Sequence, residues 1–278
     1  MYIDPIRIGA SIAVVLGTGD IASAIGHALF RSGLGVVMLR DSSVPVLRRG
    51  MAFDDALEGE STSLAGVPGV RAADLDGLPA LARGRAAVIV ADYDFAVVSA
   101  ACPAMTTVLV DARMRKYAVA ADLRPLAPCT IGIGPGFVAE GNVDFAIETL
   151  PGREGALVEH GPTAIPTGKS VPLGSAGDER FVYAVCAGPW HPSAALGDQV
   201  AAGAAIGQLG SFAVLAPIGG CVRGMVRQTA SGVARGSKLV EIDPGPGAPW
   251  TGVPPRAARI AEGVQRLADA LLSLGMPR

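Results

Sequence analysis

The stretch "VVLGTGDIASAIGHAL" at residues 14–29 decides the fold of the first part of the chain. A short apolar run, typical of a buried strand, ends in a glycine turn, and apolar residues at helical spacing follow. Gly17, Gly19 and Ala22 fit the GxGxxA form of the dinucleotide-binding fingerprint, whose glycines allow a tight turn and close approach of a pyrophosphate. The stretch therefore predicts a nucleotide-binding βα unit, or a tight βα turn that binds nothing.

Asp20 is unusual in this turn, because its carboxylate would repel a pyrophosphate at the helix N-terminus. One interpretation is structural, with Asp20 as the N-cap of the helix. In the other, Asp20 binds a donor on the ligand, such as an amino group of a pterin or a base. His27 follows about two helical turns later on nearly the same face, and it is either a packed side chain or a catalytic candidate.

Composition excludes several classes of protein. The 278 residues are 50% hydrophobic and 17% charged, which favours one large or two ordinary folded domains. A formal charge of −2 argues against a nucleic-acid partner. No apolar run reaches the ~20 residues of a membrane helix, and the first residues do not resemble a signal peptide, so we expect a soluble, cytoplasmic protein without a membrane partner.

The cysteines and histidines form no recognisable pattern. No CxxC pair occurs, and the spacing predicts neither a disulfide framework nor a metal site. The residues in question are Cys102, Cys129, Cys186, Cys221, His27, His160 and His191. Cys221 stands beside Arg223 in a glycine-rich connection, so it is either a small apolar residue or a reactive thiolate and catalytic candidate.

The chain divides into an α/β half and an all-β half. Strands are expected at 12–17, 34–40, 86–91, 106–111 and 130–134, with helical patterns between them. This alternation predicts a Rossmann-like parallel sheet over residues 1–140. Short alternating stretches rich in Gly and Pro predict an all-β domain over 150–245. An amphipathic helix is expected over 254–275.

Two segments of the all-β half repeat each other. "GDQVAAGAAIGQL" at 197–209 and "ASGVARGSKLVEI" at 230–242 share a Val-x-x-Gly core 33 residues apart. Such a repeat is typical of a barrel-sandwich built from two hairpin units. No lysine stands where biotinyl and lipoyl domains carry their modified lysine, so a swinging-arm carrier is excluded.

Several polar residues are candidates for binding a ligand. Arg40 and Asp41 follow the second strand, where an arginine meets a 2′-phosphate or an acid holds a ribose. Gly134 and Gly136 follow the fifth strand, and Asp144 and Glu148 are either ligand-facing or simply solvated carboxylates. "TAIPTGKS" at 163–170 fails as a P-loop, but its Thr167 is expected in a loop that touches an anionic ligand.

Several long motifs occur in the same order as in a known protein family. The motifs "GTGDIASAIGHAL", "RRGMAFDDALEGE", "VDARM", "IGIGPGFVAEGNVDFAIET", "GDQVAAGAAIG", "VRG", "GSKLVEIDP" and the final "EGV" helix occur in this order. The chain thereby resembles the YqeB-like proteins, described as accessory factors of selenium-dependent molybdenum hydroxylases. The resemblance implies a Rossmann-like domain, a β domain and a role in maturing the cofactor of a molybdenum hydroxylase, or its sulfur or selenium.

The resemblance also assigns positions. Those carried over by motif are Gly17, Gly19, Asp20, His27, Arg48, Arg49, Asp111, Gly134, Pro135, Gly136, Phe137, Asp144, Glu148, Thr149, Thr167, Gly168, Arg223, Gly224, Lys238, Asp243 and Pro244. Two stretches depart from the family pattern: Gly152–Glu154 replaces Arg-Gly-His, and Trp250 with "PPRAAR" replaces a cysteine and a Ser-Asp-Lys stretch.

The function expected from the sequence is that of an accessory protein. It would bind a molybdopterin-type or nucleotide-like ligand and assist cofactor modification or delivery to a hydroxylase or its maturation machinery. The alternative is an NAD(P)-dependent oxidoreductase with His27 or Lys116 as proton donor, and a third possibility is an adaptor with a structural Rossmann half. A homo-oligomer remains open.

Overall fold

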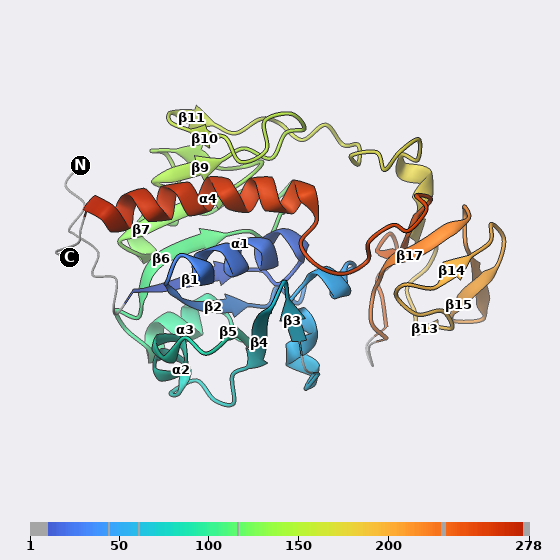
Figure 1. The fold of residues 1–278 in the computed structure, drawn as a ribbon, viewed down its shortest axis with the longest axis horizontal. Coiled ribbons are helices and arrows are strands. Elements are labelled where there is room, and N and C mark those ends of the chain that lie inside the picture. The colour runs from blue at the N-terminus through green and yellow to red at the C-terminus, as the bar shows by residue number, and fades with distance from the viewer. Residues whose placement is uncertain (1–10, 44, 61, 116, 229–231, 275–278) are drawn as a thin grey trace. The chain divides into compact units, whose positions relative to one another are not determined.

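The computed structural model describes residues 11–43, 45–60, 62–115, 117–228 and 232–274 (Figure 1). It divides into two compact units. Unit 1 comprises Met1–Asp41, Ala52–Pro166 and Val253–Arg278, and unit 2 comprises Ser42–Met51 and Thr167–Gly252. The boundaries expected from the sequence ran in chain order, whereas these units are interleaved. Lys116, an expected proton donor of the oxidoreductase alternative, lies outside the described residues.

Unit 1 is built on a mixed sheet with a parallel centre. Among the described residues the sheet has nine strands in the order β10-β9-β7-β6-β1-β2-β5-β4-β3. The strands are β1 (Ile12–Leu16), β2 (Gly35–Leu39), β3 (Thr62–Leu64), β4 (Val67–Arg71), β5 (Val88–Ala91), β6 (Thr106–Asp111), β7 (Cys129–Ile133), β9 (Phe145–Ile147) and β10 (Leu157–Val158). Only β3 and β10 run antiparallel to their neighbours. The predicted parallel sheet is confirmed, with strand ends within about two residues of expectation.

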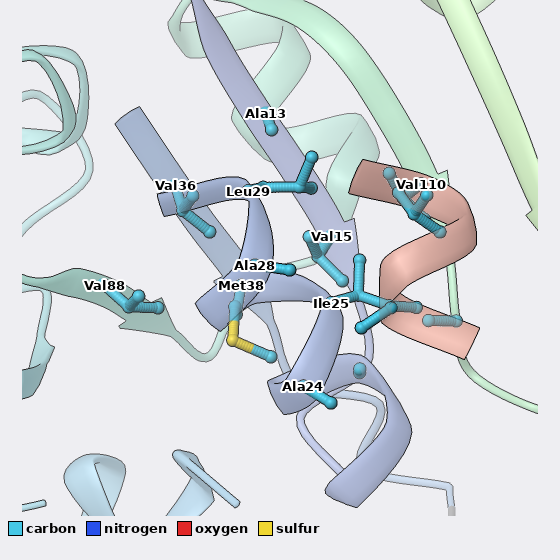
Figure 2. Close-up of a cluster of buried hydrophobic side chains, with 14 of the residues drawn as sticks. Ala13, Val15, Ala24, Ile25, Ala28, Leu29, Val36, Met38, Val88 and Val110 are labelled. Carbon is cyan, nitrogen blue, oxygen red and sulfur yellow. The ribbon is translucent and has the colours of Figure 1, made fainter. Parts of the chain in front are cut away.

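Helices cover both faces of this sheet. Helix α1 (Asp20–Arg31) and helix α4 (Pro255–Leu274) lie on one face and contact each other, and helices α2 (Leu78–Gly84) and α3 (Phe95–Ala101) lie on the other (Figure 1). Figure 2 shows Ile25 and Leu29 of α1 against Val15 of β1, where all three side chains are fully buried. The predicted amphipathic helix at the C-terminus is confirmed, and its apolar stripe joins this core.

Short elements complete unit 1. Strands β8 (Val138–Ala139) and β11 (Gly161–Pro162) form a small antiparallel pair. A 3₁₀ helix, η3 (Asp54–Glu58), follows the point where the chain re-enters unit 1, and η4 (Arg124–Leu126) precedes β7.

Unit 2 is all-β apart from short 3₁₀ turns in its described residues, η2 (Arg49–Met51) and η5 (Asp178–Arg180). One antiparallel sheet has the order β12 (Phe181–Tyr183), β18 (Lys238–Asp243), β17 (Gly220–Met225) and β14 (Gln199–Val200). The other has β13 (Trp190–Pro192), β15 (Ala205–Leu209) and β16 (Phe212–Leu215). The all-β character expected after residue 150 is thus found in unit 2, whereas residues 150–166 belong to unit 1 and β10 joins its sheet. The barrel-sandwich stays a prediction.

The internal repeat of unit 2 has a structural counterpart. Gly203 and Gly236 have φ of +80° and +83°, a region that glycine adopts readily. Each ends a tight turn that leads into a longer strand, β15 after Gly203 and β18 after Gly236. The Val-x-x-Gly core therefore occurs twice and marks a tight turn each time.

None of the helices in the described ranges combines the length and the hydropathy that crossing a membrane requires.

Candidate functional site

The carboxyl ends of the parallel strands bring many predicted residues together. Strand β1 lies between β2 and β6, so the strand order reverses at β1, which is where open α/β sheets bind ligands. The residues directly after these strands, up to Asp41 after β2, belong to unit 1. They carry Gly17, Gly19 and Asp20 after β1, Arg40 and Asp41 after β2, Asp111 at the end of β6, and Gly134 and Gly136 after β7.

The two glycines of the turn have different reasons to be glycine. Gly17 has φ +104°, and a Cβ there would lie 3.2 Å from the carbonyl oxygen of Ala112. The N–H of Gly17 donates to the carbonyl of Leu39 at 2.7 Å. A Cβ on Gly19, by contrast, would meet no atom within 4 Å. Gly17 is therefore required by the fold, whereas the space beside Gly19 is open.

Asp20 is the first residue of α1 and is half-buried. The N-cap position belongs to Gly19, whose backbone is extended and which offers no side-chain bond. The N-cap interpretation of Asp20 is therefore wrong. The carboxylate stands in the first helical turn, where N–H groups have no acceptor inside the helix.

Asp54 is far from the glycine turn in the sequence but bonds to it directly. No sequence pattern identified Asp54 as a site residue. The hydroxyl of Thr18 donates to Asp54 Oδ1 at 2.5 Å, and Arg40 donates to both Asp54 oxygens at 3.1 and 3.0 Å. Arg40 also donates to Glu58 at 2.8 Å. Burial alone would lower the pKa of Arg40, but the bonds to Asp54 and Glu58 raise it overall. Arg40 is thus held by protein carboxylates.

Two further arginines at this edge are paired in the same way. Arg115 donates to the two oxygens of Asp41 at 2.7 and 2.8 Å. Arg113 donates from Nε to Asp111 at 2.9 Å, and its second guanidinium nitrogen contacts the other carboxylate oxygen.

Acidic groups outnumber basic ones among the described residues of this edge. The carboxylates belong to Asp20, Asp41, Asp54, Glu58, Asp92 and Asp111, and the guanidinium groups belong to Arg40, Arg113 and Arg115. The local field therefore favours a ligand that brings amino groups to the turn, and it disfavours an added phosphate.

Asp144 and Glu148 lie at opposite ends of β9. Asp144 accepts from the N–H and the hydroxyl of Thr130 at 2.8 and 2.7 Å, at the amino end of β7. Glu148 is 2% exposed and accepts three backbone N–H groups, from Thr149, Leu150 and Ala164. The structure does not bring Asp144 to the glycine turn, and Glu148 is engaged in holding loops after β9.

His27 is tied to its own surroundings. Burial lowers its pKa, a hydrogen bond with the backbone of Ala65 opposes this, and the charge of Arg31 lowers it further. Seven residues of helix separate it from Asp20, roughly 10 Å along the axis. His27 and Asp20 therefore do not form an acid–base pair.

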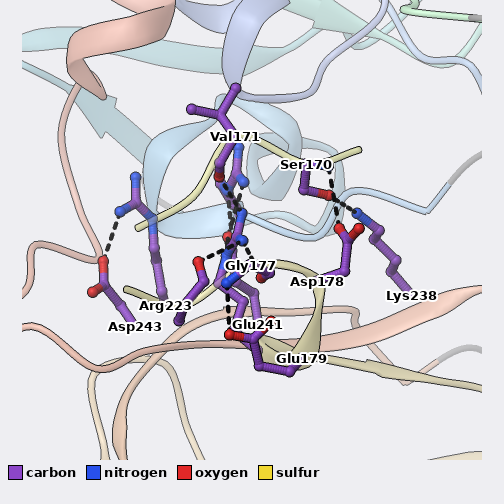
Figure 3. Close-up of polar contacts among 12 residues, drawn as sticks. Ser170, Val171, Gly177, Asp178, Glu179, Arg223, Lys238, Glu241 and Asp243 are labelled. Atoms are coloured by element: carbon purple, nitrogen blue, oxygen red, sulfur yellow. Dashed lines mark hydrogen bonds and ion pairs between the residues drawn. The ribbon is translucent and has the colours of Figure 1, made fainter. Parts of the chain in front are cut away.

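Thr167, Cys221 and Arg223 belong to unit 2. Thr167 lies in an exposed loop, where its hydroxyl accepts from the N–H of Lys169 at 3.4 Å. Arg223 is 7% exposed and donates to Asp243 at 2.8 Å (Figure 3). Burial raises the pKa of the Cys221 thiol, Asp243 raises it further, and Arg223 only partly offsets this. The thiolate-favouring setting expected for Cys221 is therefore not found.

A second charged cluster in unit 2 surrounds Glu241. Glu241 is fully buried and accepts from Arg48 at 2.6 and 3.0 Å and from Arg180 at 3.0 Å. Arg48 was singled out by the family resemblance, but Glu241 and Arg180 were not. These bonds fasten the 42–51 segment and the loop before β12 to β18.

Parts of the two departures from the family pattern, Glu154 and the "PPRAAR" stretch, meet in unit 1. Glu154 pairs with Arg259 at 3.2 Å, and Arg256 donates to the carbonyl of Thr149 at 2.8 Å. Both arginines come from "PPRAAR", and Glu154 comes from the stretch that replaces Arg-Gly-His. The Glu154–Arg259 pair therefore joins the two departing stretches, and together with the Arg256 bond it holds the start of α4.

Comparison with known proteins supports the resemblance drawn from the motifs. The chain is 30% identical over 275 residues to the uncharacterized protein YqeB of Escherichia coli (strain K12), and the match covers 96% of this chain. It covers 49% of that protein, so the chain spans about half the length of the curated relative. No family model matches.

Solved structures match only distantly. The product-bound ectoine utilization protein EutE (DoeB) from Ruegeria pomeroyi has 13% identity and a TM-score of 0.22, covering 84% of this chain and 52% of that chain. The succinylglutamatedesuccinylase/aspartoacylase from Rhodobacter sphaeroides has 13% identity and a TM-score of 0.25, covering 84% and 85%. Similarity at this level carries no argument about function.

Proposed function

We propose that unit 1 binds a nucleotide-like or molybdopterin-type ligand at the carboxyl end of β1. The observation that carries the proposal is the glycine turn itself. It lies where the strand order reverses, the space beside Gly19 is open, and Asp20 stands in the first turn of the helix behind it.

The charges at the carboxyl end of the parallel strands favour a ligand that is recognised through its amino groups. Asp20 adds a carboxylate to an edge that is already rich in acids, and a carboxylate accepts hydrogen bonds from amino groups. The pterin of a molybdopterin and the base of a cytidine both present an amino group. A pyrophosphate placed directly at the turn would meet repulsion instead.

The biological role that we propose is accessory. The chain would hand on or modify a molybdenum cofactor, or its sulfur or selenium, for a partner molybdenum hydroxylase. This part rests on the YqeB-like resemblance, which the match to YqeB over 96% of the chain supports. A cytoplasmic location belongs to the proposal, since all four cysteines are free thiols.

The rival oxidoreductase has less support from the site. It needs Arg40 or Asp41 to hold a ribose or its 2′-phosphate, and both side chains are bound by groups of the protein.

Calorimetric titration with two probes, cytidine monophosphate and a reduced pterin, tests the proposal. The wild-type chain should bind one of them, and Asp20→Ala should weaken binding about 10- to 100-fold, the worth of a hydrogen bond to a charged group. Gly19→Val should block the open space and abolish binding. Gly84→Val is the matched control, because a Cβ there also meets no atom within 4 Å, but the residue lies at the end of α2.

The control should bind like the wild type. If the wild-type chain binds neither probe, or if Asp20→Ala and Gly19→Val bind as well as Gly84→Val, the proposed site is wrong.

A further inference from the structure

The segment Ala112–Arg115 crosses the carboxyl end of β1. It begins at the end of β6, yet Arg115 reaches Asp41, which follows β2. Strands β6 and β2 flank β1 on its two sides, so their ends are about 10 Å apart, two strand spacings. The chain or the Arg115 side chain must therefore pass over the end of β1.

The same segment packs directly against the glycine turn. A Cβ on Gly17 would lie 3.2 Å from the carbonyl oxygen of Ala112 and 3.3 Å from Cα of Arg113. The N–H of Ala112 donates to the carbonyl of Leu16 at 3.0 Å. The crossing is thus fixed at its start by backbone contacts and at its end by the ion pair with Asp41.

Asp41 stands where dinucleotide-binding sheets place the acid that holds the adenosine ribose. In this chain both oxygens of Asp41 accept from Arg115, and the Asp41 side chain is only 10% exposed. Arg40, the residue suited to a 2′-phosphate, is bound to Asp54 and Glu58. Both means of holding an adenosine ribose are therefore occupied.

We infer that the Arg115–Asp41 ion pair is a specificity determinant that closes the ribose position to adenine dinucleotides. The site then accepts a ligand whose recognised part is one pterin-sized or nucleotide-sized group beside Gly19. This inference rests on the proposed function for the identity of the ligand, but the exclusion of dinucleotides is tested independently.

The test is NADH binding, followed by its fluorescence, to the full chain. Every chain in this test carries Asp20→Asn, which removes the carboxylate that repels a pyrophosphate. Against the parent that keeps Arg115, Arg115→Gln releases the two Asp41 oxygens that accept from Arg115, so the affinity for NADH should rise at least tenfold. Arg115→Met should do the same and serves as a second variant. The Arg115 side chain is 42% exposed, so neither substitution opens a cavity in the core, and the backbone contacts at Ala112 still hold the start of the segment.

The matched control is Arg124→Gln. Arg124 makes the same two-bond pair with Asp122, at 2.9 and 2.8 Å, and its side chain is 41% exposed. It should leave NADH binding at the level of the Asp20→Asn parent. Equal NADH affinity in the Asp20→Asn parent and both Arg115 variants, or micromolar NADH binding by that parent, would overturn the inference.

The two proposals fail separately. Binding of cytidine monophosphate or a pterin without any gain of NADH binding in the Arg115 variants refutes only the exclusion. A gain of NADH binding in a chain that binds neither of the other probes supports the exclusion and refutes the proposed ligand.

Discussion

Replacing Glu241 with glutamine should destabilise unit 2 more than any surface substitution there. Glu241 is fully buried, and its two oxygens accept from Arg48 and from Arg180, which is itself 2% exposed. Burial alone would raise the pKa of Glu241, but the bond and charge of Arg48, followed by Arg180, lower it overall. The carboxylate is therefore ionised in the folded state.

The magnitude follows from the loss of one partner of a buried ion pair, about 3–5 kcal/mol. Glu241→Gln keeps the side-chain shape and one acceptor oxygen, so we expect the lower end, about 3 kcal/mol. Unit 2 has roughly one hundred residues, a size at which 1 kcal/mol moves the melting temperature by about 4–8 °C. Its transition should therefore fall by roughly 12–24 °C.

Differential scanning calorimetry measures this shift, and it also shows whether the two units melt in separate transitions. Glu179→Gln is the control, because Glu179 is exposed in the same unit and its replacement should leave the transition close to that of the wild type. If Glu241→Gln melts within a few degrees of the Glu179→Gln control, the buried pair does not contribute as argued.

Three further predictions concern the turn, acid stability and thiol reactivity. Gly17→Ala should cost about 1–3 kcal/mol in urea unfolding, because φ is +104° and its Cβ meets backbone, whereas Gly19→Ala should change stability by less than about 0.5 kcal/mol. The stabilisation from Glu241 is complete above its unfolded-state pKa of about 4.5, and it is lost as the pH falls through its lowered folded-state pKa. Between pH 6 and pH 3 the melting temperature should therefore fall less steeply in Glu241→Gln than in the wild type. Iodoacetamide at pH 8 should label half-buried Cys186 well before buried Cys221, as peptide mass spectrometry would show, and faster labelling of Cys221 would contradict the raised pKa of its thiol.

Local patterns predicted the framework of unit 1. Apolar runs located β1, β2 and β6, and the glycine turn after β1 was recognised from its spacing. These features depend on residues close in the sequence, whose periodicity directly reflects burial on the two faces of a sheet.

The partners of charged residues were not predictable in the same way. Arg40 and Asp41 were recognised from their place after the second strand, and Asp111 came from the family resemblance, but each is paired with a protein group. Asp41 pairs with Arg115, 74 residues away along the chain, and Arg48 pairs with Glu241 across 193 residues. An apolar pattern shows which face of an element is buried, but it does not show which charged side chain lies opposite.

The interleaving of the two units has the same origin. The 42–51 segment carries no pattern that distinguishes it from a loop of unit 1, yet Met225 donates to the carbonyl of Leu47 at 2.8 Å, and Gly224 gives the space that Leu47 needs. The acidic run "FDDALEGE" at 53–60 was the available signal for Asp54, because it places several carboxylates shortly after Arg40.

The most direct test of the central claim is to purify the chain under native conditions, denature it and identify the released small molecule by mass spectrometry. The account predicts a pterin or a cytidine species at close to one molecule per chain, and its loss from Gly19→Val but not from Gly84→Val. Release of NAD or NADP instead would contradict both the ligand class and the closure of the ribose position by Arg115.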